Sequence, residues 1–227
     1  MHAFGVPDMV EIKICGIKDD AIARVAIECG ANYGGIVIGT PDSPRNVTID
    51  KAANFLHVMR GDIKTVLVIK ELTRELFTNV IDLDPDYVQI HKVAAAETID
   101  RLHQCLAGGI IFGITPSTSE VALAGLARVA KNQDMFLVDG SMGKGKAIDY
   151  KSLKELSDRV QKLLHLRLND LLVAGGFNHK NIGVFLRQFV PRGIDASSGL
   201  ESAPGVKDPA RIKAFCAAIK AACPDDY

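Results

Sequence analysis

Residues 10–20 read VEIKICGIKDD. Apolar side chains alternate with other residues as far as Cys15, which is the pattern of a β-strand, and Gly16 ends the run. Residues 21–30, AIARVAIECG, then place apolar side chains at steps of three and four, which is the pattern of an amphipathic helix. One strand followed by one helix is therefore predicted here.

The same strand–helix unit recurs along the whole chain. Further runs rich in β-forming residues occupy 33–38, 64–69, 87–91, 110–114, 135–139, 170–174 and 193–196, and a segment of helical periodicity follows each of them. Several runs, such as TVLVI (65–69) and FLVD (136–139), are almost continuously apolar, which indicates strands buried on both faces of a parallel sheet. Eight such units predict an α/β protein with a (β/α)8 barrel, while an open doubly wound sheet is the alternative because periodicity alone does not close a sheet.

No linker or low-complexity stretch interrupts the series, so we predict a single barrel domain over residues 10–227 with a flexible lead-in over residues 1–9. The longest stretch without periodicity is GSMGKGKAIDY, residues 140–150. Its glycines and its position after the sixth strand predict a loop that closes over a bound substrate.

Composition narrows the possible partners. The formal net charge is zero, so a nucleic-acid partner is not expected, and no apolar run approaches the roughly 20 residues of a membrane span. The five cysteines are odd in number and lack CxxC spacing, which favours a reducing compartment and a cytoplasmic protein. The scattered histidines give no support for a metal, and no cofactor is predicted. The oligomeric state, monomer or homodimer, stays open.

In a (β/α)8 barrel the functional residues lie at the C-terminal ends of the strands and in the loops that follow. The candidates at these positions are Cys15, Arg45, Lys70, His91, Lys92, Asp139, Gly175, Gly176, Asp195, Ser197, Ser198 and Gly199.

Two motifs at the ends of the last two strands predict a phosphate site. VAGGFNHKNI (173–182) follows the seventh strand, and IDASSGLESAPGVKD (194–208) contains the eighth. Paired small residues allow a phosphate to approach backbone N–H groups, and the loops after strands seven and eight are the usual phosphate site of this fold. A small phosphorylated molecule is thus the expected ligand.

Three other candidates each admit two interpretations. Cys15 is either a buried packing residue or a base. Asp139 either accepts hydrogen bonds in its loop or is a general acid in an apolar environment. Arg45 either covers the rim or binds a carboxylate with its forked donors.

KICGIKDD, together with SPR, VQIH, FLVDG, DY, AGGFNHKNI and DASSGLESAPGVKD, strongly resembles the phosphoribosylanthranilate isomerase family, in order and over nearly the whole chain after residue 9. The resemblance implies a cofactor-free (β/α)8 isomerase of tryptophan biosynthesis. Such an enzyme performs an Amadori rearrangement of N-(5-phosphoribosyl)anthranilate to 1-(o-carboxyphenylamino)-1-deoxyribulose 5-phosphate.

The resemblance also implies residue roles. Cys15 would be the base that removes the proton from C2 of the ribose, and Asp139 would be the acid that protonates the ring oxygen. Arg45 would hold the anthranilate carboxylate. The substrate phosphate would be held in the loops that contain Gly175, Gly176, Asp195, Ser197 and Ser198.

The sequence departs from the family near the predicted mouth of the barrel. Lys70 replaces a small polar residue, Lys92 replaces a glycine, and the loop after Asp139 contains Lys144. These lysines are either solvated loop residues or a sign of a more anionic substrate.

Two alternatives to the family's reaction are therefore kept. One is a related aldose–ketose isomerase acting on another phosphorylated aminosugar. The other is a non-catalytic phosphosugar-binding barrel, which would not need the acid and the base. Indole-3-glycerol-phosphate synthase, a related barrel, is less favoured because it would leave Cys15 and Asp139 unexplained.

Overall fold

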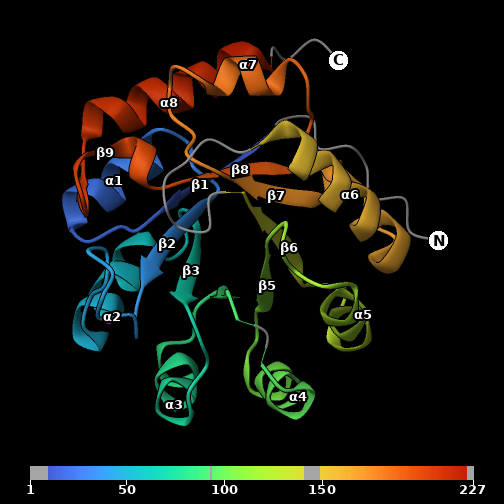
Figure 1. The fold of residues 1–227 in the computed structure, drawn as a ribbon. Coiled ribbons are helices and arrows are strands. Elements are labelled where there is room, and N and C mark those ends of the chain that lie inside the picture. Colours follow the sequence, from blue (N-terminus) through green and yellow to red (C-terminus); the bar gives the residue numbers. More distant parts are fainter. Residues whose placement is uncertain (1–9, 93, 141–148, 224–227) are drawn as a thin grey trace.

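A computed structural model describes residues 10–92, 94–140 and 149–223. Eight strands form a closed barrel in chain order, and every neighbouring pair is parallel (Figure 1). The strands are β1 (Glu11–Cys15), β2 (Tyr33–Val37), β3 (Lys64–Ile69), β4 (Tyr87–Ile90), β5 (Gly109–Ile114), β6 (Met135–Asp139), β7 (Leu171–Ala174) and β8 (Gly193–Ala196). The predicted barrel is confirmed, and the open sheet is excluded because β8 pairs with β1.

Helices surround the barrel (Figure 1). They are α1 (Asp20–Glu28), α2 (Ile49–Met59), α3 (Arg74–Leu83), α4 (Ala96–Cys105), α5 (Glu120–Val129), α6 (Tyr150–Leu164), α7 (Ile182–Leu186) and α8 (Pro209–Ala222). A Ser, Thr or Asp side chain caps the N-terminus of six of them, namely α1, α2, α3, α5, α6 and α8. These caps accept backbone N–H groups that a helix cannot satisfy internally, so they set where each helix begins.

The strands are buried on both faces, which explains their nearly continuous apolar sequences. One cluster of side chains fills the space between strands and helices, and a second fills the barrel interior. In β1, Ile12 and Ile14 belong to the outer cluster and Cys15 to the inner one. The alternation in VEIKIC therefore separates an outer apolar face from an inner face that carries Lys13 and Cys15.

Two parts of the C-terminal third differ from the sequence prediction. Helix α7 has only five residues. In the loop before it, the Asn181 side chain accepts from the backbone N–H of Asn178 and donates to the carbonyl oxygen of Gly176, which holds a turn there. After the turn η2 (Ser198–Leu200), a two-stranded antiparallel hairpin of β9 (Glu201–Ala203) and β10 (Val206–Lys207) was not predicted. A second turn, η1 (Leu168–Asp170), precedes β7.

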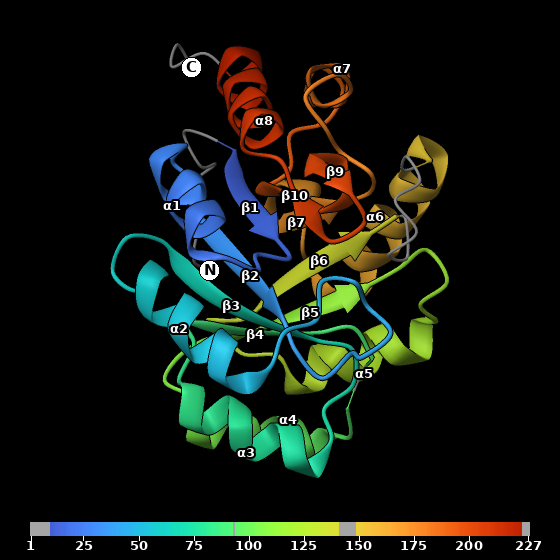
Figure 2. The ribbon, with the colours of Figure 1, turned by 90° about the vertical axis from the view of Figure 1, so that its left-hand side faces the viewer.

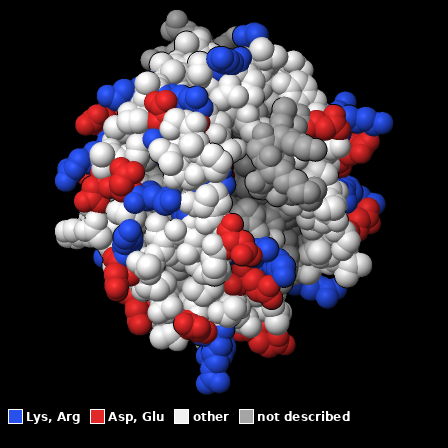
Figure 3. Space-filling model, turned by 60° about the vertical axis from the view of Figure 1, so that its left-hand side comes forward, with Lys and Arg blue, Asp and Glu red and all other residues white. Residues whose placement is uncertain are grey.

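Some predictions concern parts of the chain that the structure does not describe. The lead-in over residues 1–9 and most of the loop over residues 140–150, with Lys144, lie outside the described residues. Within the described ranges no helix has both the length and the hydropathy to span a membrane. On the described part of the face shown in Figure 3, acidic and basic side chains are intermixed.

The interior cluster gives a test of how the barrel is stabilised. Leu137 of β6 is fully buried in that cluster, so Leu137→Ala should lower the free energy of unfolding by about 2–5 kcal/mol through lost burial and a new cavity. Urea denaturation measures the change. Val121→Ala, at a position that is 83% exposed, is the control and should change it by less than about 0.5 kcal/mol. Equal effects of the two substitutions would contradict this account of the core.

Candidate active site

A cavity of about 560 Å³ opens at the C-terminal ends of the strands. It brings together eleven of the twelve candidate residues: Cys15, Arg45, Lys70, His91, Lys92, Asp139, Gly175, Gly176, Asp195, Ser197 and Ser198. Gly199 does not line it. A side chain at residue 199 would collide with the carbonyl oxygen of Phe177, so this glycine lets the loops after β7 and β8 pack together.

Cys15 is the last residue of β1, and its side chain faces the barrel interior. Gly16 follows with a φ of +81°, a conformation that favours glycine. A Cβ on Gly16 would also lie 2.8 Å from Cδ of Arg45. The glycine therefore ends the strand and leaves room for the arginine to lie across the end of β1.

A buried ion pair lies beneath Cys15. The ammonium of Lys13, which is fully buried, lies 2.8 Å from Oδ1 of Asp195. Lys13 and Cys15 are close to each other beside Gly35. A Cβ at residue 35 would lie 3.3 Å from the Cys15 Sγ and also 3.3 Å from the Lys13 Nζ. The base candidate thus has an ammonium group as a neighbour.

Burial and charge act on this thiol in opposite directions. Burial raises the pKa of Cys15 above its ordinary value, and Lys13 is the strongest influence that lowers it. For Lys13, burial alone would lower the pKa, but the charge and hydrogen bond of Asp195, with a contribution from Cys15, raise it. Lys13 therefore stays protonated and favours the thiolate form of Cys15.

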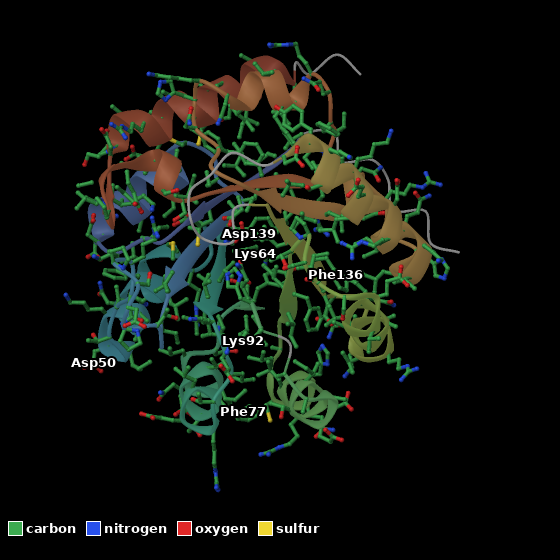
Figure 4. The ribbon with its side chains drawn as sticks, viewed as in Figure 1. Asp50, Lys64, Phe77, Lys92, Phe136 and Asp139 are labelled. Atoms are coloured by element: carbon green, nitrogen blue, oxygen red, sulfur yellow. The ribbon has the colours of Figure 1, made fainter. Side chains whose placement is uncertain are left out.

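Asp139 ends β6 and lies near the centre of the barrel in Figure 4. Lys64 overlaps it in that view but belongs to the other end of the barrel, since it begins β3 whereas Asp139 ends β6. The carboxyl group of Asp139 is buried, with 7% of the residue exposed, and it lines the cavity. Cys15 and Asp139 therefore enter one cavity from β1 and β6.

Gln89 and His91 form the β4 side of the cavity. The amide nitrogen of Gln89 lies 3.0 Å from Nε2 of His91. Burial lowers the pKa of His91, so the ring is neutral near pH 7. Which of the two groups donates in this contact depends on the tautomer of the ring. The amide oxygen Oε1 of Gln89 is buried and has no hydrogen-bond partner among the described residues.

Arg45 is held by an acidic residue that the sequence did not single out. Its Nε lies 2.7 Å from Oε1 of Glu201, and its Nη2 lies 2.8 Å from Oε2. Lys207 also binds Glu201, at 2.7 Å. Burial opposes ionisation of Glu201, but hydrogen bonds from Arg45 and Lys207 lower its pKa to about 2.

The predicted phosphate corner is built from backbone and small side chains. Gly175 and Gly176 line the cavity, and neither has a side chain that would block access to its backbone. The φ of Gly176 is +65°. Ser197 donates its hydroxyl to the carbonyl oxygen of Cys15 at 3.1 Å. The corner is thus tied directly to the residue predicted as the base.

Comparison with known proteins decides the family. The sequence profile described as N-(5'-phosphoribosyl)anthranilate (PRA) isomerase matches residues 12–218. The chain belongs to the phosphoribosylanthranilate isomerase family. The resemblance drawn from KICG and the C-terminal motif is thereby confirmed.

Relatives in the phosphoribosylanthranilate isomerase family match over most of their length. The N-(5'-phosphoribosyl)anthranilate isomerase of Chelativorans sp. is 34% identical, with 94% of this chain and 97% of that protein covered. The enzyme of the same name from Paramagnetospirillum magneticum is 33% identical, with 95% and 99% covered. The solved structure of that isomerase from Pyrococcus furiosus is 26% identical, with a TM-score of 0.73 and coverage of 93% and 99%.

The lysines that depart from the phosphoribosylanthranilate isomerase pattern lie on the β3–β4 side. Lys70 and Lys92 both line the cavity. Lys92 lies 2.7 Å from Glu71, and both side chains are largely exposed. In Figure 4, Lys92 lies between Asp139 and the helix α3. The carboxylate of Glu71 therefore offsets the charge of Lys92.

The sequence did not identify four of the residues that shape this site: Lys13, Gln89, Glu201 and Lys207. Signals for them were present, since Lys13 is a charged residue in an apolar strand and Glu201 and Lys207 lie in the C-terminal motif. Burying a lysine or a glutamate requires a partner, so each indicates an ion pair. The identity of the partner became apparent only from the fold.

The contact of Lys13 with Cys15 can be tested by thiol reactivity. Lys13→Met should raise the midpoint for alkylation of Cys15 by about 1–3 pH units, because the ammonium is lost while the Asp195 charge stays. Iodoacetamide labelling across a pH series, followed by peptide mass spectrometry, measures the midpoint. Lys64→Met, at the other end of the barrel, is the control. An unchanged or lower midpoint in Lys13→Met would refute the assignment.

The Glu201 cluster predicts a pH dependence of stability. The pKa of Glu201 falls from 4.5 to about 2 on folding, so its contribution is complete above pH 4.5 and is lost as pH falls toward 2. The shift corresponds to about 3 kcal/mol. The difference in free energy of unfolding between wild type and Glu201→Gln should shrink by about that amount over this range. Urea titrations at several pH values measure it, and a constant difference would contradict the prediction.

Proposed function

We propose that this protein is a phosphoribosylanthranilate isomerase that acts in tryptophan biosynthesis in the cytoplasm. It converts N-(5-phosphoribosyl)anthranilate to 1-(o-carboxyphenylamino)-1-deoxyribulose 5-phosphate. The observation that carries the proposal is the joint position of Cys15 and Asp139 in one cavity, between an arginine and a corner of small residues. A reaction that moves a proton between neighbouring carbons needs one acid and one base acting on the same substrate.

Asp139 and Cys15 act in different steps of the reaction. Asp139 protonates the ring oxygen of the ribose, the C1–O bond breaks, and the anilino nitrogen supplies the electron pair that forms a protonated Schiff base. The thiolate of Cys15 then removes the proton from C2. The electrons of the C2–H bond form the enolamine and neutralise the nitrogen. Return of a proton to C1 and ketonisation at C2 complete the aminoketose.

Other cavity residues hold the substrate during these steps. Gly175, Gly176, Ser197 and Ser198 are proposed to bind the phosphate through backbone N–H groups and hydroxyls. Arg45 is proposed to bind the anthranilate carboxylate. The amide oxygen of Gln89, which has no partner among the residues that the structure describes, is available to a ribose hydroxyl.

The charge of Lys92 at the mouth does not favour a different substrate. An additional anion on the substrate would require uncompensated positive charge, and Lys92 is already paired with Glu71. Both groups are exposed, where a single ion pair or a single lysine has little effect on charge selectivity. Lys92 therefore gives no support for a more anionic aminosugar as the substrate.

Turnover of N-(5-phosphoribosyl)anthranilate by the purified protein tests the proposal. Wild type should convert it, whereas Cys15→Ser and Asp139→Asn should each lower kcat by about 10²–10⁴-fold, the usual contribution of a general acid or base. Loss of substrate fluorescence measures the rate. Binding of a ribose-phosphate analogue without turnover would instead favour the non-catalytic barrel.

A further inference from the structure

Glu201 is surrounded by hydrogen-bond donors on the β2 side of the cavity. Only 6% of the residue is exposed, and its carboxylate accepts from two nitrogens of Arg45, from Lys207 and from the backbone N–H of Gly205 at 3.1 Å. A carboxylate with this many donors is fixed in position. The arginine that it binds is fixed with it.

The geometry of the pair leaves one edge of the guanidinium unused. Glu201 takes the edge that contains Nε–H and one N–H of Nη2. A guanidinium has five N–H groups, so both N–H groups of Nη1 and one of Nη2 are left. No other described residue accepts a hydrogen bond from this side chain, and Arg45 lines the cavity. The unused edge has the spacing that binds a second carboxylate in a bidentate manner.

Lys207 keeps the cluster positive. Arg45 and Glu201 alone would sum to zero charge and would attract a substrate carboxylate weakly. Lys207, which is 7% exposed, adds one positive charge at 2.7 Å from Glu201. The cluster as a whole therefore carries a charge of +1, and its exposed edge belongs to the arginine.

The β9–β10 hairpin places Glu201 against the loop that carries Arg45. Gly205 has a φ of +77° and lies so close to the carbonyl oxygen of Pro44 that a side chain would not fit. Arg211 of α8 donates to the carbonyl oxygen of Glu201, and the hairpin lies beside that helix in Figure 2. The hairpin is thus held from both sides.

We propose that Glu201 is a positioning residue that orients Arg45 and so makes the enzyme selective for a substrate that carries a carboxylate beside the anilino nitrogen. This inference rests on the proposed function, in which Arg45 binds the anthranilate carboxylate. Glu201 itself does not touch the substrate, and Lys207 preserves the net charge of the cluster.

Two substrates that differ only in the carboxylate separate positioning from a general structural role. They are N-(5-phosphoribosyl)anthranilate and N-(5-phosphoribosyl)aniline. The quantity measured is the ratio of kcat/KM for the first to kcat/KM for the second. It is determined for wild type, Glu201→Gln, Arg45→Met and the double variant.

Wild type should favour the carboxylated substrate, and Arg45→Met should abolish the preference. Glu201→Gln raises the charge of the cluster from +1 to +2, which by itself would favour the carboxylated substrate. It should nevertheless lower the preference by about tenfold, mainly through KM for that substrate, because a misplaced donor weakens one charge-assisted contact. The double variant should match Arg45→Met, since Glu201 acts through Arg45. Glu28→Gln, in an exposed pair with Lys213, is the control and should leave both substrates unaffected.

Equal losses on both substrates in Glu201→Gln would overturn the inference and leave a structural role only. If Glu201→Gln does not fold, Glu201→Asp keeps the charge but draws it back by one methylene, and it should show the same selective loss. An unchanged substrate ratio in Glu201→Asp would overturn the inference equally. Conversion of neither substrate by wild type would overturn the proposed function, and this inference with it.

Discussion

The ion pair between Lys13 and Asp195 joins the first strand of the barrel to the last. The two residues are register partners in the β1–β8 pairing, and their charged atoms are 2.8 Å apart in the interior. A slip of one residue would leave two charges buried without partners, which costs far more than an apolar mismatch. The pair therefore fixes the register in which Cys15 and Ser197, each two residues further along, reach the cavity together.

An ion pair in this position is not explained by stability. Taking both charges out of water costs about as much as their attraction returns, and a well-packed apolar pair is often as stable or more so. What an apolar pair would not supply is a positive charge beside Cys15, whose thiol is otherwise made less acidic by burial. The charge of Lys13 thus serves the base candidate, and closing the barrel at Asp195 lets it remain buried.

The fold was predictable because its signals are local. Strand and helix periodicities repeat eight times, and side-chain caps mark most helix starts, so neighbouring residues contain the information. The site was predictable only in part. The C-terminal ends of the strands indicated Cys15 and Asp139, but the partner of Lys13 is 182 residues away and the partner of Arg45 is 156 residues away. No local pattern specifies such pairs, and the short hairpin that carries Glu201 has too few residues to show a strand period.

The arrangement of charges separates binding from chemistry. The acid and base candidates lie on β6 and β1, whereas the groups suited to anions follow β2, β7 and β8. An elongated substrate with a carboxylate at one end and a phosphate at the other would be fixed at both ends, with its reacting carbons held between them. On the β3–β4 side, Lys92 is offset by Glu71 and His91 is neutral, which leaves Lys70 as the charged group lining that side. Under the proposed function, the two ends set the orientation of the substrate, and its reacting carbons then lie between Cys15 and Asp139.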